Sequence, residues 1–179
     1  DLQFDQIAGI VPHDSAERVP AAGEPVDVRT ERQGRSVFAV RDLAVGETVL
    51  KAWGPRLPNR SRHTMQVDVD THIMPDGVMV LVRHSCDPNC GVLVRGDERQ
   101  IEVRALRPIA AGEEITLDYN TFEYEIDAAG GPCQCGAARC RGRVPGYKHV
   151  AAEVRARYGE YVAEYLKVLE NGLSAPVGA

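Results

Sequence analysis

The chain has 179 residues, of which 44% are hydrophobic and 26% are charged, and its formal net charge at pH 7 is −5. This length accommodates one domain with a hydrophobic core, and the composition is that of an ordinary globular protein. The negative charge excludes a broadly basic surface for direct nucleic-acid binding. No apolar run approaches the roughly 20 residues that span a bilayer, and the first residues lack a signal-peptide pattern. We therefore expect no membrane contact and a cytoplasmic location.

Short strands joined by tight turns are predicted between Val26 and Tyr119. Residues 26–30 and 36–40 alternate apolar and polar side chains around a turn, which predicts a β-hairpin. Residues 91–106 predict a second hairpin that turns at Gly96–Asp97. A continuous apolar run is typical of a buried strand, and alternation is typical of a half-buried one. Both kinds are expected among the remaining strands, at residues 47–53, 64–70, 77–82 (the apolar run) and 113–119.

Two segments of the predicted β region resemble each other. Residues 41–50 and 107–116 share an arginine, an apolar pair, a Gly-Glu turn and the start of a new strand. The similarity allows two interpretations. It is either an internal repeat or a chance recurrence of Gly-Glu turns, which are common in β proteins.

The pattern changes after Tyr119. Residues 120–146 are rich in glycine and cysteine and predict an irregular loop. From Tyr147 to Glu170 apolar residues recur at helical spacing, and Asn171–Gly172 supplies a stop signal. One C-terminal helix is therefore expected to follow the cysteine-rich loop.

The five cysteines fall in two groups that are far apart in the sequence. An odd number of clustered cysteines argues against a closed disulfide framework. Cys133, Cys135 and Cys140 form a C-x-C-x4-C pattern, and three thiolates do not complete the tetrahedral shell of a structural zinc ion. The pattern therefore predicts one zinc site, because a metal can fold a loop that is too poor in apolar residues to fold alone. The fourth ligand would come from one of three upstream side chains: His84, Cys86 or Cys90.

The same cysteines allow two other interpretations. His84 and Cys86 could form a catalytic Cys–His pair, which would need an oxyanion hole and an orienting third group. Nothing in the sequence identifies either group. The cysteines could also form a buried cluster or a redox pair without metal, although their close spacing is uncommon by chance.

Four motifs occur in a fixed order, at residues 34–50 ("GRSVFAVRDLAVGETVL"), 84–90 ("HSCDPNC"), 112–120 ("GEEITLDYN") and 133–142 ("CQCGAARCRG"). Together they resemble the SET-domain protein lysine methyltransferases with a post-SET zinc loop. The resemblance implies a mainly β fold of small sheets, in which the segment ending at Tyr119 threads under the loop near His84 as a pseudoknot. It also implies four parts: a lead segment (1–25), a SET domain (26–126), a post-SET zinc loop (127–145) and a C-terminal helix with its tail (146–179).

The resemblance further implies S-adenosylmethionine as the methyl donor and a lysine side chain that enters from the opposite face. Tyr119 matches the catalytic tyrosine of the family, and Cys86 matches the fourth ligand of one structural zinc ion, with Cys133, Cys135 and Cys140. Cys90 would then be a spare thiol. Donor binding is implied for the residues that match the donor loop and the first motif: Gly34, Arg35, Ser36, Arg83 and His84.

Four positions depart from the family pattern. Arg83 stands where the family has Asn, and Ser36 stands where the donor loop has its second Gly. Leu117 replaces Phe or Tyr, and Ala52 replaces Tyr, in the expected lysine channel. These losses predict a wider and less polar channel that binds a slim lysine chain poorly. A bulkier ligand could instead contact the remaining aromatic side chains near that pocket: Trp53, Phe122 and Tyr124.

Three functions remain open at this point. The chain could be a SET-type methyltransferase acting on a protein lysine or another amine, an enzyme that uses the same cleft on a small molecule, or a silent binding module. Fold resemblance alone does not choose among them, because one fold can carry several activities. The oligomeric state is open as well.

Overall fold

The computed structural model describes residues 18–32, 34–57, 59–61, 63–126 and 131–174, and it is mainly β. The N-terminal part of the predicted lead segment and residues 127–130 of the predicted zinc loop lie outside this description. The strands are β1 (Val26–Glu31), β2 (Gly34–Ala39), β3 (Thr48–Trp53), β4 (Arg56–Leu57), β5 (Met65–Asp68), β6 (Thr71–Ile73), β7 (Arg83–His84), β8 (Cys90–Arg95), β9 (Gln100–Ala105) and β10 (Thr116–Leu117). The helices are α1 (Ala151–Tyr158) and α2 (Glu164–Ser174), with 3-10 turns η2 (Met79–Leu81), η3 (Tyr119–Thr121), η5 (Tyr147–His149) and η6 (Gly159–Tyr161).

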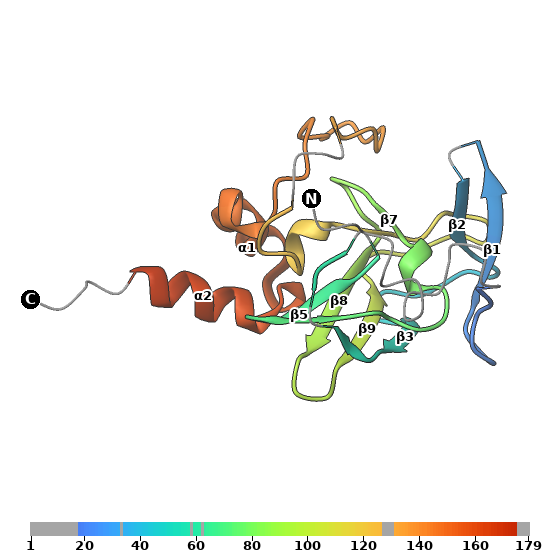
Figure 1. The fold of residues 1–179 in the computed structure, drawn as a ribbon. Helices are drawn as coiled ribbons and strands as arrows, with labels where there is room; N and C mark the ends of the chain where they lie inside the picture. Colours follow the sequence, from blue (N-terminus) through green and yellow to red (C-terminus); the bar gives the residue numbers. More distant parts are fainter. Residues whose placement is uncertain (1–17, 33, 58, 62, 127–130, 175–179) are drawn as a thin grey trace, which may run out of the picture.

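The strands form four small sheets, with the orders β1-β2, β3-β9-β8, β4-β6-β5 and β7-β10. Figure 1 shows the β1–β2 hairpin at one edge of the molecule and the two helices at the other, with α2 extending away from the body. The first three sheets are antiparallel, whereas β7 and β10 pair in parallel. Both predicted hairpins are confirmed, because β1 pairs with β2 and β8 pairs with β9 around the turn at Gly96.

The prediction of a strand over residues 77–82 is wrong. The chain turns at Gly77, where φ is +56°, and then forms the 3-10 turn η2. Val78, Met79 and Val82 are nevertheless buried in the hydrophobic core. A continuous apolar run reports burial but does not distinguish a strand from a short buried helical turn.

The single C-terminal helix is also a wrong prediction, because the helical region is split. Gly159 ends α1 with φ of +54°, and Val162 is extended. The backbone N–H of Ala163 leaves the helical pattern and donates to the carbonyl of Thr121 at 2.9 Å. The chain then starts α2, which continues past the predicted stop at Asn171–Gly172. The break lets the helical segment pack on two surfaces of the body.

The two similar segments are related by an approximate two-fold symmetry in their contacts. Leu43 and Ile109 exchange both backbone hydrogen bonds, at 2.8 and 3.1 Å. Each glycine of the two Gly-Glu turns has positive φ and donates its N–H to the carbonyl two residues before the other segment, Gly46 to Ala105 and Gly112 to Ala39. The interpretation as a meaningful repeat is therefore the better one. This paired unit holds the end of β2 beside the segment that leads into β10.

The segment around β10 lies directly beside the loop that follows β7. Thr116 and Leu117 pair with Arg83 and His84, and Ser85 continues the contact by donating its N–H to the carbonyl of Leu117. Asn89 is 1% exposed, and its side-chain amide donates to the carbonyl of Glu114 and accepts from the N–H of Thr116. These bonds agree with the threaded arrangement expected near His84.

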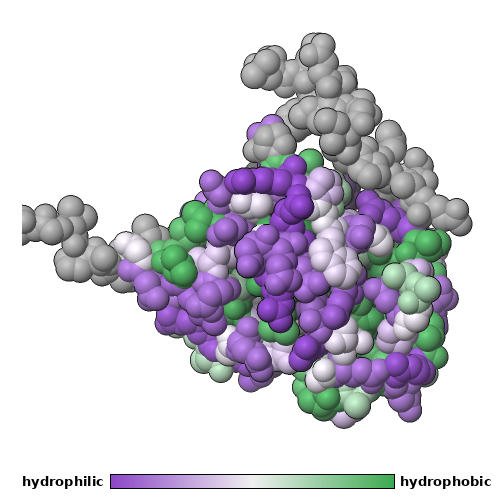
Figure 2. Space-filling model, turned by 90° about the horizontal axis from the view of Figure 1, so that it is seen from below, coloured by the Kyte–Doolittle hydropathy of each residue, from purple (hydrophilic) through white to green (hydrophobic). Residues whose placement is uncertain are grey.

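One face of the molecule is largely polar at its centre. Figure 2 shows a face whose centre is covered by hydrophilic side chains, with hydrophobic ones gathered nearer its edges. None of the helices in the described part of the chain is long and apolar enough to cross a bilayer.

Glu123 is a buried carboxyl group, 7% exposed, that lies against β5. One of its oxygens accepts the backbone N–H of Gln66 at 2.9 Å. Burial raises the pKa of Glu123 to about 7, although the bond from Gln66 acts in the opposite direction. The core around it therefore favours the neutral acid.

This carboxyl group gives a pH-dependent prediction. The pKa of Glu123 in the folded state lies above its ordinary value of 4.5. The contribution of the neutral acid to stability is therefore fully present below pH 4.5 and is lost as the pH rises through 7. At high pH, ionised Glu123 should lower the free energy of unfolding of the natural chain by an amount on the order of 3 kcal/mol. We expect Glu123→Gln, which cannot ionise, to lack this loss of stability. Urea unfolding at acidic and alkaline pH would measure it, with the exposed Glu98→Gln as the control. Equal pH dependence in the natural chain and Glu123→Gln would contradict this assignment.

Candidate active site

Tyr119 begins the turn η3 directly after β10, so the parallel β7–β10 pair determines where it lies. Its hydroxyl donates to the carbonyl of Val82 at 2.7 Å. The ring contacts His84 edge-on, with centroids 5.3 Å apart, and lies against Phe122 at 5.5 Å. The phenol is thus held by a hydrogen bond at its tip and by two rings at its sides.

His84 connects Tyr119 to the cysteine region. Its Nδ1 accepts the backbone N–H of Tyr119 at 3.2 Å, and its Nε2 lies 3.3 Å from the sulfur of Cys86. Burial lowers the pKa of His84 to about 4, although Asp118 acts in the opposite direction. The imidazole is therefore neutral at neutral pH. Both contacts are made by the side chain of His84.

A cleft of about 860 Å³ opens beside Tyr119. Three predicted site residues, Arg83, His84 and Tyr119, line it together with two of the predicted metal ligands. We call it the Tyr119 cleft. Its wall residues are Glu31, Arg32, Phe38, Arg83, His84, Ser85, Glu114, Thr116, Tyr119, Cys133, Gln134, Cys135, Gly136 and Val144. Sequence patterns had not singled out the β1–β2 turn or Glu114 for this site.

Arg83 lies in a polar network on the wall of the Tyr119 cleft. Its guanidinium donates to the carbonyl of Gly34 at 2.8 Å and forms an ion pair with Glu114 at 3.5 Å. The hydroxyl of Ser36, which is fully buried, also donates to Glu114. Arg83 therefore already has a carboxylate partner within the chain. Gly34, Arg35 and Ser36 flank the cleft and are not among its wall residues.

Four cysteines that are up to 54 residues apart in the sequence meet at one corner of this site. The sulfurs of Cys86, Cys133, Cys135 and Cys140 all lie within 4.8 Å of one another, and those of Cys86 and Cys133 are 3.9 Å apart. Zinc bonds of about 2.3 Å in a regular tetrahedron place sulfurs roughly 3.8 Å apart. The cluster thus has the number, type and approximate spacing of ligands for one zinc ion.

Cys90 lies outside this cluster. It is 1% exposed, in the core beside β9, and burial raises the pKa of its thiol to about 12. Cys86 is fully buried among three other sulfurs, which argues against its service as a nucleophile, because a nucleophile must be reached by a substrate.

The five predicted substrate-pocket residues do not gather in the Tyr119 cleft. Ala52 and Leu117 are each 1% exposed in the hydrophobic core, and Phe122 is 3% exposed against the ring of Tyr119. Tyr124 is half-buried next to Lys148, and Trp53 is 45% exposed at the end of β3. Trp53, Phe122 and Tyr124 therefore do not form a common wall for a bulky ligand in this cleft.

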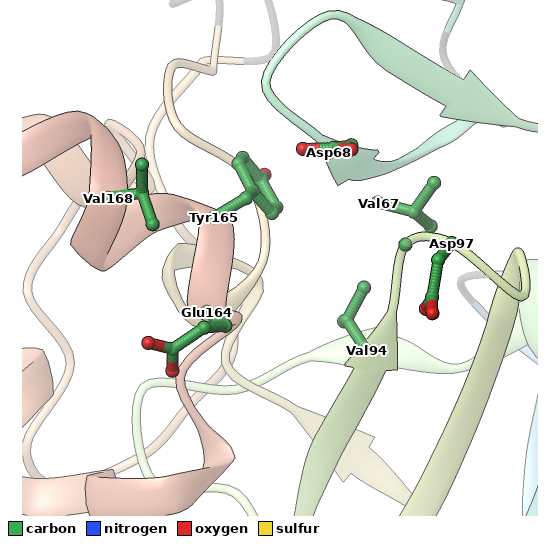
Figure 3. A pocket seen from close by; sticks show the side chains of 8 residues that line it. Val67, Asp68, Val94, Asp97, Glu164, Tyr165 and Val168 are labelled. Carbon is green, nitrogen blue, oxygen red and sulfur yellow. The ribbon is translucent and has the colours of Figure 1, made fainter.

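A smaller hollow of about 240 Å³ lies on another part of the surface, between α2 and the ends of β5 and β8. Figure 3 shows Glu164, Tyr165 and Val168 of α2 on one side of the hollow and Val67, Asp68, Val94 and Asp97 on the other, with the carboxylate of Glu164 pointing away from the second group. The hydroxyl of Tyr165 is already engaged, because it donates to the carbonyl of Phe122 at 2.6 Å. None of the predicted site residues lines this hollow.

Comparison with known families identifies the fold. The family described as "SET domain" matches residues 34–120, the range from Gly34 to the residue after Tyr119. Residues 34–120 of this chain are a SET domain. The matched range holds both segments of the internal repeat and the β7–β10 pair, so the SET domain supplies Tyr119 and Cys86. The other three cysteines of the cluster lie beyond it.

Several curated proteins are similar to this SET domain. The "Histone-lysine N-methyltransferase, H3 lysine-4 specific" of Saccharomyces cerevisiae is 39% identical over 87 residues, which are 46% of this chain and 8% of that protein. The trithorax histone-lysine N-methyltransferase of Drosophila virilis is 30% identical over 132 residues, 63% of this chain and 3% of that protein. The "Histone-lysine N-methyltransferase, H3 lysine-36 specific" of Chaetomium globosum is 43% identical over 65 residues, which are 35% of this chain and 7% of that protein. The chain thus spans a small fraction of the length of these relatives.

A solved structure shows the same fold. The crystal structure of KRYPTONITE in complex with mCHH DNA, an H3(1–15) peptide and SAH superposes with a TM-score of 0.55 and 23% identity. The match covers 66% of this SET-domain chain and 29% of that chain.

Proposed function

We propose that this SET-domain protein is an S-adenosylmethionine-dependent methyltransferase that acts on a lysine side chain of a protein. The observation that carries the proposal is the position of Tyr119, whose phenol is fixed at the wall of a cleft of about 860 Å³ beside a four-cysteine cluster. The family supports the reaction type, since the relatives named above are histone-lysine N-methyltransferases.

The Tyr119 cleft suits the methyl donor in size and chemistry. Its volume of about 860 Å³ lies within the roughly 300–1,000 Å³ of ordinary small-molecule sites. The donor carries a carboxylate, and Arg83 offers a guanidinium on the cleft wall that can bind one by charge-assisted hydrogen bonds. The other residues proposed for donor binding are those on or beside this wall: Gly34, Arg35, Ser36 and His84.

One structural zinc ion would be held by Cys86, Cys133, Cys135 and Cys140. No residue from 131 to 145 is buried, so this loop has no apolar core of its own. A metal that binds four thiolates would supply the missing free energy of folding. Its role is architectural, because a site with four protein ligands leaves no position open for a substrate.

S-adenosylmethionine supplies a methyl group on a positively charged sulfur. The protein then has to align an amine with that group and stabilise the charge that moves between them. The Tyr119 hydroxyl donates to the carbonyl of Val82, so the phenol oxygen is held in a fixed position at the cleft wall, where it can contact an amine or a polarised methyl group. The rings of His84 and Phe122 hold the phenol in this orientation.

A basic protein segment is the proposed substrate class. The net charge of −5 favours association with cationic peptides, and the relatives are named for lysines of histone H3. Those names cite different lysines, so the similarity does not select one position. A histone substrate would require access to chromatin, whereas the sequence alone predicts a cytoplasmic location; identifying the substrate decides between them.

Calorimetric titration of the zinc-loaded protein with S-adenosylmethionine tests the proposal. We expect one S-adenosylmethionine to bind per chain. Arg83→Met should weaken the affinity for it by about 10-fold or more, since a hydrogen bond to a charged group contributes roughly 1.5–3 kcal/mol. Arg56→Met, which removes an exposed arginine of β4, is the matched control and should bind within about twofold of the natural chain. A folded, zinc-loaded protein that binds no donor would refute the proposal and favour a silent binding module.

A further inference from the structure

Asp118 is a fully buried carboxylate that directly precedes Tyr119. Its oxygens accept hydrogen bonds from the backbone and side chain of Asn120 and from the hydroxyl of Tyr158. Its charge partner is Arg141, whose Nη1 lies 2.9 Å from Oδ2. A buried charge requires such a partner, because removing one member of the pair leaves the other uncompensated in a low-dielectric site.

Arg141 belongs to the cysteine loop and not to the SET domain. It follows Cys140, and its backbone N–H donates to the sulfur of Cys86 at 3.4 Å. Its guanidinium side chain is only 11% exposed and reaches both Asp118 and Glu153 of α1, with Nη2 2.7 Å from the Glu153 carboxylate. One residue thus connects the sulfur cluster, the buried carboxylate and the first helix.

A second connection joins the cluster to Tyr119 through His84. Its Nδ1 accepts the backbone N–H of Tyr119, so that nitrogen carries no proton. The other nitrogen, Nε2, therefore carries the proton and can donate to the sulfur of Cys86. The four-cysteine cluster is consequently connected to both sides of the peptide bond between Asp118 and Tyr119, through Arg141 on one side and through Cys86 and His84 on the other.

We infer that Arg141 is a positioning residue for Tyr119. Through Arg141, the position of the cysteine loop on the SET domain sets the geometry of methyl transfer. This inference rests on the proposed function. When the loop is seated, the guanidinium neutralises Asp118, and the turn η3 is held in place. Without it, the charge of Asp118 is left uncompensated in the core, and the tyrosine that follows loses its support.

The test compares zinc-loaded Arg141→Met, Arg141→Lys and the double variant Asp118→Asn/Arg141→Met. For Arg141→Met we expect kcat to fall by about 10- to 100-fold, because a displacement of the order of 1 Å has that effect. KM, the donor dissociation constant and the zinc content should stay near their natural values. Arg141→Lys should recover much of kcat. The double variant should have a higher kcat than Arg141→Met, because it leaves no carboxylate unpaired at position 118. Arg139→Met, an exposed arginine of the same loop, is the matched control.

Amide hydrogen exchange gives a readout that does not depend on turnover. In zinc-loaded Arg141→Met, the amides of Tyr119 and Asn120 should exchange at least about 10-fold faster, while those of β8 and β9 stay protected. Unchanged exchange and unchanged kcat would overturn the inference. So would a loss of rate that is matched by an equal loss of zinc. If no form of the protein transfers methyl groups, the proposed function fails, and the exchange experiment alone then decides the role of Arg141.

Discussion

Replacing Tyr119 by Phe should lower the rate of methyl transfer by about 100- to 1,000-fold, the range seen when one pre-positioned polar group is removed from a reacting centre. The change deletes the hydroxyl and keeps the ring, which is held between His84 and Phe122. Loss of the bond to Val82 leaves one backbone carbonyl without that donor, so the fold should be only slightly less stable. The effect should therefore fall on kcat, with the affinity for S-adenosylmethionine nearly unchanged.

Single-turnover kinetics with donor and a lysine peptide would measure this effect, and calorimetry would measure donor binding. Tyr124→Phe is the matched control, since Tyr124 is half-buried nearby but does not line the Tyr119 cleft. If Tyr119→Phe transfers methyl groups as fast as the natural chain, the phenol hydroxyl has no role in the reaction. A loss of donor affinity that accounts for the whole effect would assign Tyr119 to binding alone.

Replacing Cys135 by Ser should release zinc and unfold the whole loop from residue 131 to residue 145. The loop has no buried residues, and structural zinc contributes apparent binding free energies of roughly 10–16 kcal/mol in small zinc domains. The disturbance should spread to Asp118 and Tyr119 through Arg141 and His84. The β3-β9-β8 sheet should persist, because its side chains pack in the hydrophobic core.

Zinc analysis and amide hydrogen exchange would follow both effects. Cys90→Ala is the control, because Cys90 is buried outside the cluster and should leave one zinc per chain. Zinc retained in Cys135→Ser and lost in Cys90→Ala would contradict the ligand assignment. A loop that stays protected after the metal has been removed would show that it folds without zinc.

The cysteine cluster and the hairpins could be predicted because their signals are local. The C-x-C-x4-C spacing marks three ligands, and the tetrahedral preference of zinc requires a fourth from elsewhere. Alternating side chains mark β1, β2, β8 and β9 in the same direct way. The motif around Cys86 then selected the partner that the structure places beside the loop.

The contacts that hold the site together had no such signal. Arg141 and Asp118 are 23 positions apart, and nothing in their neighbours indicates that a loop arginine reaches a buried carboxylate. The pairing of Arg83 with Glu114 is hidden in the same way. Likewise, position counting assigned Ala52 to a ligand pocket, whereas its strand places the side chain in the core.

Intact-mass analysis of a basic lysine peptide, incubated with the zinc-loaded protein and S-adenosylmethionine bearing a deuterated methyl group, tests the central claim most directly. Each transferred group adds the mass of one labelled methyl, and fragmentation locates it. We expect labelled methyl on a lysine side chain with the natural protein and almost none with Tyr119→Phe. Absence of label from every peptide and protein tried, with a folded protein that carries zinc and binds the donor, would contradict the account.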